Sequence, residues 1–327
     1  MSSPVDQITI AVTVYDRRQF VKQAVASALD QTTPVRVLVV EDCGPDAGME
    51  NFVKAEFGSR IEYVRNSRRR GLFGNWNSCV ELCRTERISI LHDDDFLAPR
   101  FAEAMRELEQ LAPGRALYFG INVGVDETGA PVPALTPPAF SGRWVERGLK
   151  DILYAPFWFP GHLFRVATAK RLGGFRESSL FCGDWEMWAK LMADGGAAQI
   201  NEKLAFMRHH GGWEKGTNQV IREGRQYPLS YVQHKRILAL LPQPGRPKFD
   251  RKELVRRCPL PTRFLVRHGD LLPRRLLDYH VELLLLSAAP HRRYAVFQWL
   301  ARILGSRFVR WSAVINRRLS GVGRDRC

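Results

Sequence analysis

The sequence predicts an α/β protein in which helices flank a mixed, mainly parallel sheet, followed by a basic, mainly α-helical C-terminal extension. Three observations predict this fold class. Short apolar, β-branched runs alternate with stretches whose apolar residues recur at helical spacing, as in chains built from βαβ units. Two of the predicted strands run directly into acidic turns. Within the 327 residues, the whole formal net charge of +15 falls in residues 223–327.

The predicted elements follow one another in a regular order. Ile8–Val14 predicts a strand, Phe20–Leu29 a helix and Val35–Val40 a second strand, which together form a βαβ unit. The remaining regular elements alternate helix and strand at Phe52–Phe57, Ile61–Val64, Asn75–Leu82, Ile88–Leu91, Phe101–Leu111 and Ala116–Val125, with a last helix at Trp185–Met192. Gly129–Gly142, with four prolines, predicts a loop, and Phe206–Gly216 predicts an irregular stretch.

The charge distribution divides the chain into two regions. Residues 1–222 hold 27 basic and 27 acidic side chains, whereas residues 223–327 hold 22 and 7. We therefore expect a formally neutral first domain at 1–222 and a basic region at 223–327 that meets something anionic. In the basic region, Pro242–Pro247 predicts a linker, and Leu276–Leu286 and Tyr294–Arg318 predict helices.

The cysteine pattern and the N-terminal residues indicate the compartment. The six cysteines form no CxxC pair and no Cys/His metal box, and the N-terminus lacks a basic segment followed by an apolar one. We therefore expect free thiols in a reducing, cytoplasmic setting. The longest apolar run, Val281–Pro290, is broken by Glu282 and is far shorter than the ~20 residues of a membrane helix, so no membrane span is predicted.

Three adjacent carboxylates, Asp93–Asp95, directly follow the predicted strand at Ile88–Leu91. Like charges a few ångströms apart repel one another and raise each other's pKa, unless a cation lies among them. Mg²⁺ and Mn²⁺ are held by one or two protein carboxylates together with waters and substrate phosphates, so this turn suits a metal that carries a diphosphate. The alternative is an acidic turn that only caps the next helix.

Polar residues also follow the second strand. Asp42, beside Glu41, offers a carboxylate that accepts hydrogen bonds from a base N–H or a ribose hydroxyl, and the alternative is a cap for the turn at Gly44. The loop at 66–77 carries three arginines and two glycines where a helix starts, a combination that favours an anion. A solvated charged loop is the competing interpretation.

Asp184 lies among bulky apolar residues, an environment that raises a carboxyl pKa toward the range of a general base. It is also placed to cap the helix predicted at Trp185–Met192, where Glu186 in the first turn favours the helix dipole. His209 and His210 can supply a metal ligand or a phosphate contact, against the alternative of two ordinary loop histidines.

Together these motifs resemble the inverting family 2 glycosyltransferases, whose Rossmann-like nucleotide-sugar-binding fold is called GT-A. The matching motifs occur in the family's order, and they are Ile10–Arg17, Ser27–Gln31, Val39–Asp42, Gly71 with Asn75–Asn77, Leu91–Asp95, Gly183–Trp188 and Arg208–His210. Each motif is weak alone, whereas all of them in one order across the first two thirds of the chain are specific.

The resemblance implies an enzyme that moves a sugar from a UDP-, dTDP- or GDP-linked donor to an acceptor, with Mn²⁺ or Mg²⁺ as cofactor. It implies that Asp42 reads the base and that Asp184 deprotonates the acceptor hydroxyl in one inverting displacement. The residues that it implies are Val14, Tyr15, Asp16, Arg17, Asp42, Asn66, Gly71, Asn75, Asp93 and Asp94 for the nucleotide sugar, Asp94, Asp95 and His210 for the metal, Asp184 for catalysis, and Trp185, Glu186 and His209 for the acceptor or a secondary contact.

Three features depart from the family pattern, of which the mildest is Glu41 in place of an Asp. His92 stands where many members carry the first Asp of the metal motif, which leaves open the register of the three aspartates that follow. The turn after Asp42 reads Cys-Gly-Pro rather than Gly-Ser or Asn-Ser, and this change puts base contacts at that turn in question.

The basic region allows three interpretations. Residues 290–327 interleave arginines with aromatic side chains, a pattern typical of a helix at the headgroup boundary of an anionic membrane, here the inner face of the cytoplasmic membrane. The aromatic residues are Phe297, Trp299, Phe308 and Trp311. The same stripe can instead pack on the first domain with its arginines in water, or form a homodimer contact.

Functions of other classes compete with the transferase hypothesis. A nucleic-acid-binding protein fits the basic region but leaves the acidic clusters unexplained, so we expect no nucleic-acid partner. A non-catalytic scaffold has no need of Asp94 and Asp184, and a nucleotidyltransferase requires a glycine-rich signature with a lysine that Ala11–Arg18 lacks. We expect a hexosyl- or deoxyhexosyltransferase acting on a glycan, lipid-linked or small-molecule acceptor, with bacterial cell-envelope polysaccharide assembly implied by the resemblance alone.

Overall fold

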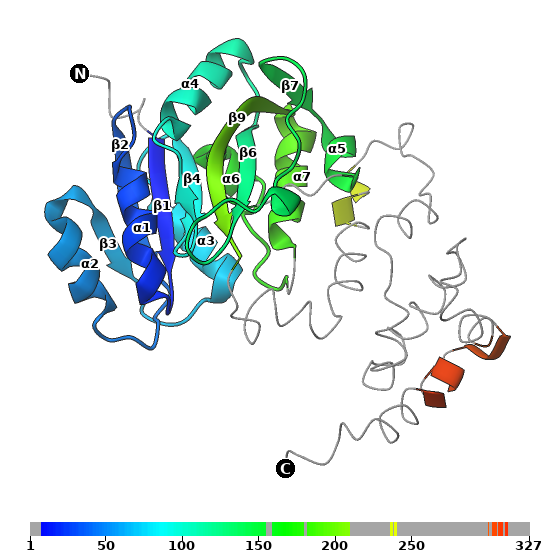
Figure 1. The fold of residues 1–327 in the computed structure, drawn as a ribbon, viewed down its shortest axis with the longest axis horizontal. Helices are drawn as coiled ribbons and strands as arrows, with labels where there is room; N and C mark the ends of the chain where they lie inside the picture. Colours follow the sequence, from blue (N-terminus) through cyan, green and yellow to red (C-terminus); the bar gives the residue numbers. More distant parts are fainter. Residues whose placement is uncertain are drawn as a thin grey trace. The chain divides into compact units, whose positions relative to one another are not determined.

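The computed structural model describes residues 8–154, 159–179, 182–209, 236–237, 239–240, 300, 303–305, 307–309 and 311–312 (Figure 1). The chain divides into two compact units, Met1–Trp213 with Gln233–Leu241 and Glu214–Val232 with Pro242–Cys327. The predicted boundary between residues 222 and 223 lies outside the described residues and stays a prediction.

The first half of the fold is a parallel sheet built from successive strand–helix units (Figure 1). Its elements are β1 (Ile8–Val14), α1 (Arg18–Leu29), β2 (Val35–Glu41), α2 (Met49–Phe57), β3 (Glu62–Arg65), α3 (Gly71–Leu82) and β4 (Arg87–His92). β1 pairs in parallel with both β2 and β4, and β2 pairs in parallel with β3. Every residue of β1 is buried, as expected for a parallel strand covered on both faces. These strands therefore end at the same edge of the sheet.

The second half adds strands in both directions. Its elements are β5 (Phe96–Leu97), α4 (Phe101–Leu111), β6 (Leu117–Val125), β7 (Trp144–Arg147), α5 (Leu149–Tyr154), β8 (His162–Arg165), α6 (Val166–Arg171), α7 (Gly183–Gly195) and β9 (Ala197–Arg208), with short 3₁₀ helices at Gly58–Arg60 and Pro133–Leu135. The strand order is β3-β2-β1-β4-β8-β6-β9-β5, with β7 beside β9. β8 lies antiparallel between β4 and β6, whereas β6 and β9 run parallel.

Two apolar clusters hold the helices on the sheet. One cluster includes buried side chains of α3 and α7, and the other includes buried side chains of α1 and α4. The most deeply buried aromatic side chains of the first cluster are Trp76, Phe164, Phe175 and Trp188. Apolar residues recur three or four positions apart along α4, at Phe101, Ala104, Met105 and Leu108, and all of them are buried. The sheet is thus fixed from both faces.

The predicted fold class is confirmed, and each helix and strand predicted before residue 126 is present with small shifts at its ends. The helix predicted at Asn75–Leu82 begins earlier, at Gly71. The strands β5, β7, β8 and β9 and the helices α5 and α6 were not predicted. The interpretation of Phe206–Gly216 as irregular was wrong for its first residues, because Phe206–Arg208 complete β9 beside β6.

Two local expectations have different outcomes. The loop predicted at Gly129–Gly142 is present, with one short 3₁₀ helix inside it. The interpretation of Asp184 as a helix N-cap was wrong, because α7 begins one residue earlier, at Gly183. The N-cap is Cys182, whose φ of 53° lies in the left-handed region, and its side chain makes no capping hydrogen bond.

The predictions for the C-terminal region are tested only in part. The described residues within Tyr294–Arg318 are helical, whereas the linker at Pro242–Pro247 and the helix at Leu276–Leu286 lie outside the described residues. Among the described residues, none of the helices has the length and apolar character needed to cross a membrane. Among the described residues, Cys43, Cys79, Cys83 and Cys182 take part in no disulfide bond.

Candidate functional site

Three parallel strands end side by side, and polar residues follow each of them. Thr13 near the end of β1 lies level with His92 at the end of β4, and Val14 lies level with Glu41 at the end of β2. The turns that follow carry most of the predicted site residues. In open α/β sheets, ligands bind outside the carboxyl ends of the strands, so this edge is the candidate site.

Asp93 is almost fully buried at the end of β4 and is held by the turn after β1. Its carboxylate accepts hydrogen bonds from Tyr15 N at 3.2 Å and from Arg17 Nη1 at 2.9 Å. Arg17 Nη1 also lies 3.3 Å from Asp94 Oδ2. Asp16, between Tyr15 and Arg17, adds negative charge near the guanidinium. One arginine therefore contacts two adjacent carboxylates and offsets part of their negative charge.

Arg208 of β9 holds the other side of the acidic turn. Its backbone N–H donates to Asp95 Oδ1 at 2.9 Å, and its Nε donates to the carbonyl of Asp94 at 2.9 Å. The buried guanidinium also donates to the carbonyls of Asp126 and Glu127 after β6. Arg208 belongs to one of the matching motifs but was not among the predicted site residues. Its position directly before His209 and His210 is the one sequence feature that pointed to a role at the site.

Burial and crowding perturb the ionisation of this turn. Burial, together with the charge of Asp94, raises the pKa of Asp93 to about 6, although Arg17 opposes the shift. Burial and Asp94 also raise the pKa of Asp95. Burial alone would lower the pKa of His92, but its contact with Asp95 and the neighbouring carboxylates raise it. A group of carboxylates with raised pKa values is stabilised by an added cation.

Three side chains of the turn fit a divalent cation. His92, Asp94 and Asp95 each offer one ligand atom, and these atoms lie within 4.8 Å of one another. The buried Nε2 of His92 has no hydrogen-bond partner among the described residues. Carboxylate oxygens suit Mg²⁺ and Mn²⁺, and the imidazole nitrogen shifts the preference toward a transition metal such as Mn²⁺. Two predicted ligands, Asp94 and Asp95, thus come together with His92, which was not predicted, while His210 lies outside the described residues.

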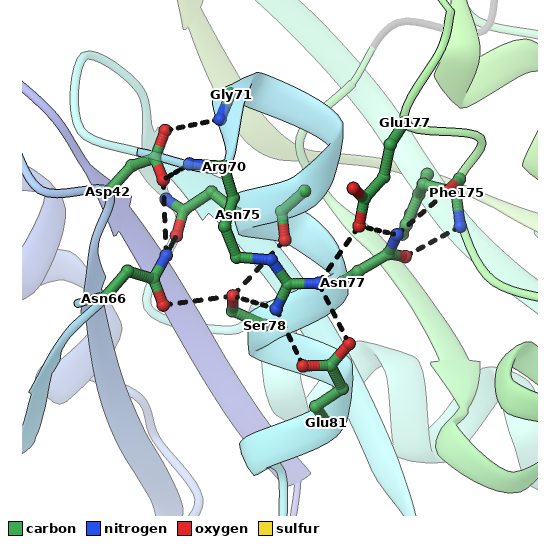
Figure 2. Close-up of polar contacts among 11 residues, drawn as sticks. Asp42, Asn66, Arg70, Gly71, Asn75, Asn77, Ser78, Glu81, Phe175 and Glu177 are labelled. Atoms are coloured by element: carbon green, nitrogen blue, oxygen red, sulfur yellow. Dashed lines mark hydrogen bonds and ion pairs between the residues drawn. The ribbon is translucent and has the colours of Figure 1, made fainter. Parts of the chain in front are cut away.

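Asp42 closes the loop that starts α3 (Figure 2). It is 4% exposed, and it accepts hydrogen bonds from Arg70 N at 2.7 Å and Gly71 N at 2.8 Å. Asn66 Nδ2 donates to Asp42 Oδ1 at 3.3 Å and to Asn75 Oδ1 at 3.0 Å. Four predicted nucleotide-binding residues, Asp42, Asn66, Gly71 and Asn75, therefore form one cluster. Because the first amides of a helix need acceptors, this cluster also explains why α3 begins at Gly71.

Glu41, rather than Asp42, ties down the turn at Gly44. The fully buried Glu41 carboxylate accepts hydrogen bonds from Gly44 N at 3.0 Å and from Tyr63 Oη at 2.7 Å, and it forms an ion pair with Arg65. The alternative interpretation of Asp42 as the cap of this turn was wrong, because the neighbouring carboxylate fills that role.

Asp184 lies in the first turn of α7 and is partly buried. Burial raises its pKa to about 6, although hydrogen bonding to the amide of Trp185 and the charge of His92 oppose the shift. The ring of His92 stacks on Phe159 with centroids 4.3 Å apart, and the Phe159 ring lies 5.9 Å from that of Trp188, one turn after Asp184 in α7. Helix α7 therefore packs close to the acidic turn. A carboxylate with a raised pKa accepts a proton more readily, as a general base requires.

Glu186, predicted for the acceptor or a secondary contact, is buried among three cations. Its carboxylate accepts a hydrogen bond from Arg176 Nε at 2.8 Å and lies 3.8 Å from Lys190 Nζ and 3.3 Å from Arg236 Nη1. Burial alone would raise its pKa, but Arg176 and the two other cations lower it. The carboxylate is therefore fully engaged within the protein.

The remaining predicted residues line the surroundings. Val14 is the buried last residue of β1, and Trp185 is partly buried against the apolar cluster that contains Trp188. His209 is exposed directly after β9, and its backbone N–H donates to the carbonyl of Val125 at 2.7 Å. The structure thus brings the predicted strand-end residues together and places His209 directly after the end of β9.

Comparison with known proteins identifies related sequences. The model of the family "Glycosyl transferase family 2" matches residues 9–144. The chain is 25% identical over 207 residues to chondroitin synthase of Escherichia coli. It is 29% identical over 220 residues to the succinoglycan biosynthesis protein ExoO of Rhizobium meliloti (strain 1021). These matches cover 62% and 63% of this chain but only 28% and 61% of the two relatives.

Solved structures with the same fold include residues 1–349 of S. aureus TarS. Its complex with UDP-GlcNAc matches with a TM-score of 0.63 at 14% identity and covers 95% of this chain and 92% of that chain. Its complex with UDP matches with a TM-score of 0.62 at 14% identity and covers 95% and 91%. At this identity the likeness concerns the fold, and the predicted GT-A architecture is confirmed.

Proposed function

The chain belongs to glycosyl transferase family 2 over the residues that the family model matches, and we propose that it transfers a sugar from a nucleotide diphosphate donor to an acceptor hydroxyl. One observation carries the proposal: the turns that hold Asp42 and Asp93–Asp95 lie at one edge of the sheet, and α7, with Asp184 in its first turn, packs close to that edge. Asp42 suits the nucleobase of the donor, the acidic turn suits its diphosphate through a bound cation, and Asp184 suits the acceptor hydroxyl.

Asp42 is proposed to read the base of the donor. A carboxylate accepts about four hydrogen bonds. Asp42 Oδ1 already accepts from Arg70 N and Asn66 Nδ2, and Oδ2 accepts from Gly71 N. One lone pair on Oδ2 therefore remains for a base N–H, such as the imide of uracil or thymine. The TarS complexes with UDP and UDP-GlcNAc support a UDP-linked donor, with dTDP- and GDP-linked sugars as the alternatives.

The sugar itself is proposed to transfer in one inverting displacement. The acceptor oxygen attacks the anomeric carbon while its proton passes to the Asp184 carboxylate. The bond from that carbon to the diphosphate breaks on the opposite side, and the electron pair leaves with the phosphate oxygen. Configuration at the anomeric carbon therefore inverts, and no second carboxylate is needed as a nucleophile. In this arrangement Asp93 contacts the ribose, and Tyr15 and Asp16 lie near the base.

A divalent cation fits this site at His92, Asp94 and Asp95, and His210 is a further predicted ligand. When bound, Mn²⁺ or Mg²⁺ neutralises charge on the leaving diphosphate. The protein's own contribution is to hold these ligands in place, because Arg208 fixes both the backbone of Asp94 and the carboxylate of Asp95.

We place the reaction in bacterial polysaccharide synthesis, which the names of the two relatives support. The acceptor is then a growing glycan, a lipid-linked saccharide or a small molecule. Lipid-linked acceptors lie at the membrane surface, where the basic, aromatic residues 290–327 would bind anionic headgroups. Association through a homodimer is the alternative use of this segment.

A thermal-shift screen with UDP, dTDP, GDP and CMP, each with and without Mn²⁺, tests the donor. A nucleoside diphosphate that raises Tm only with Mn²⁺ supports the proposal and identifies the base, since a ligand at 100 times its Kd stabilises by about 2.7 kcal/mol. Asp184→Asn should keep this shift while kcat falls by ~10²–10⁴-fold. No shift with any nucleotide, together with salt-sensitive binding of DNA or RNA, would favour the nucleic-acid alternative, and a shift without turnover would favour the scaffold.

A further inference from the structure

The short segment 174–177 lies between α3 and α7, and α3 contacts it through Asn77 (Figure 2). Asn77 Nδ2 donates to the carbonyl of Phe175 at 2.9 Å, and the amide of Phe175 donates to Asn77 Oδ1 at 2.8 Å. One side-chain amide thus satisfies both backbone groups of one residue, as a neighbouring strand would. Phe175 is 2% exposed and packs edge-on against Trp76 of α3, with ring centroids 5.0 Å apart.

Gly174 shows how closely the segment approaches Asn77. Its φ of +64° lies in the left-handed region, where glycine is favoured. A Cβ atom at this position would lie 2.6 Å from Asn77 Oδ1, which is shorter than real contacts allow. Because the Asn77 amide lies this close, residue 174 has no room for a side chain and must be glycine.

Arg176 and Glu177 of the segment bind different helices. Glu177 Oε1 accepts hydrogen bonds from Arg70 Nη2 at 3.0 Å and from Asn77 Nδ2 at 3.3 Å, both on the α3 side. Arg176 binds the buried Glu186 of α7, with Nε 2.8 Å and Nη2 2.7 Å from Glu186 Oε1. The segment is therefore joined to both helices by charged or paired hydrogen bonds.

The contacts of segment 174–177 lead to both parts of the proposed active site, namely the Asp42 cluster and Asp184. Arg70, which binds Glu177 through its guanidinium, gives its backbone N–H to Asp42 on the donor side. Glu186, which binds Arg176, lies two residues after Asp184 in the first turn of α7. A displacement of the segment relative to α3 would therefore move Asp184 relative to the bound donor.

We propose that Asn77 is a positioning residue for sugar transfer, which acts through segment 174–177 to place Asp184 against the donor. The inference rests on the proposed function, because it assigns a role to Asn77 in that same reaction. The exposed Arg70–Glu177 pair contributes little by itself, since solvent screens ion pairs of this kind. The paired amide contacts of Asn77 and the ion pair of Arg176 with the buried Glu186 carry the placement. An error of ~1 Å in such a placement costs ~100-fold in rate.

Steady-state kinetics of Asn77→Asp test this role. The aspartate keeps the acceptor for the Phe175 amide but loses the donor, and its charge repels the Phe175 carbonyl and Glu177. We expect kcat to fall by ~10–100-fold with KM for the donor changed by less than ~2-fold, because the contacts of Asp42 are intact. Glu81→Gln is the matched control, since Glu81 lies on α3 and pairs with Arg70 but does not touch the segment. It should leave both constants within ~2-fold of wild type.

Hydrogen exchange provides a second readout that needs no turnover. In Asn77→Ala, which removes both contacts, amides of residues 174–179 and of the first turn of α7 should exchange faster, while those of β1 remain slow. Wild-type kcat in Asn77→Asp would overturn the positioning role and leave the transferase proposal standing. Unchanged exchange in α7 would overturn it whatever the activity. If wild type transfers no sugar but exchange in α7 increases, the proposed function fails while the structural link holds.

Discussion

Replacing His162 by phenylalanine should make the protein less sensitive to acid. His162 is 3% exposed in β8 and stacks on Trp188 with ring centroids 4.4 Å apart. Neither ring nitrogen has a full hydrogen bond within the described part of the chain. Burial lowers the pKa of this imidazole from 6.5 to about 3, and the backbone at Pro160 offsets only part of the shift. The folded protein therefore holds His162 neutral.

The two pKa values set the pH window and the size of the effect. At pH values between the folded and unfolded pKa, the unfolded chain binds a proton that the folded chain does not, so stability falls as pH falls. For a pKa of 6.5 in the unfolded chain and about 3 in the folded one, the loss due to His162 is about 2 kcal/mol at pH 5 and about 0.1 kcal/mol at pH 7.5. His162→Phe keeps a ring between its neighbours and removes this loss.

Urea unfolding followed by circular dichroism at pH 7.5 and pH 5.0 measures the effect. The stability of His162→Phe relative to wild type should rise by about 2 kcal/mol between the two pH values. His209→Gln, at an exposed histidine, is the matched control and should show no such rise. A difference between His162→Phe and wild type that is the same at both pH values would refute the reasoning, because it would mean that burial does not keep His162 neutral.

Three further changes test other parts of the molecule. Asp94→Ala should weaken Mn²⁺-dependent nucleotide binding in calorimetry by ~10-fold or more, since it removes a charged ligand; unchanged affinity would assign the metal to a neighbouring aspartate. Glu41→Gln should lower the free energy of unfolding by about 2 kcal/mol in urea titrations, because it breaks a buried ion pair with Arg65; an unchanged midpoint would contradict this. The full chain should sediment with anionic vesicles and lose this binding when residues 290–327 are deleted, whereas equal sedimentation of both proteins would exclude a membrane role for the segment.

The first half of the sheet could be predicted because its signals are local. β1 and β4 are short apolar runs buried along most of their length, and the helices between the strands repeat apolar residues at helical spacing. Parallel strands then bring their carboxyl ends to one edge, so Asp42 and Asp93 could be expected near one another without knowing any contact. The match between expectation and structure at this edge follows from topology.

The later strands depend on partners that are distant in the sequence. β8 has only four residues and contains a buried histidine, and it becomes a strand because β4 and β6 pair with it on both sides. β9 carries a mixture of buried and half-buried positions, because β5, β6 and β7 all pair along it. No local period encodes either pattern, so neither strand could be predicted from the sequence alone.

The same reason explains why the partners of some residues near the site could not be predicted. In the sequence, Arg208 is a basic residue beside two histidines. In the structure its guanidinium is buried and donates hydrogen bonds to backbone carbonyls after β6. Glu186 lies in the first turn of α7 as expected, and its cations Arg176 and Arg236 are 10 and 50 residues away in the sequence. In both residues the sequence gives the charge correctly, and the tertiary partners decide the role.

Helix α3 connects the predictable part of the site with the unpredictable part. Gly71 and Asn75 near the start of α3 belong to the Asp42 cluster, whereas Asn77 binds segment 174–177, which precedes α7. Gly71 and Asn77 are separated by about 9 Å along a helix axis, at 1.5 Å per residue. Phe73 and Trp76 between them are buried, so the helix cannot rotate or slide without loss of packing. A single rigid helix thus fixes the distance between the Asp42 cluster and segment 174–177, which is proposed to position Asp184. A change at Asn77 should therefore alter catalysis without altering donor recognition.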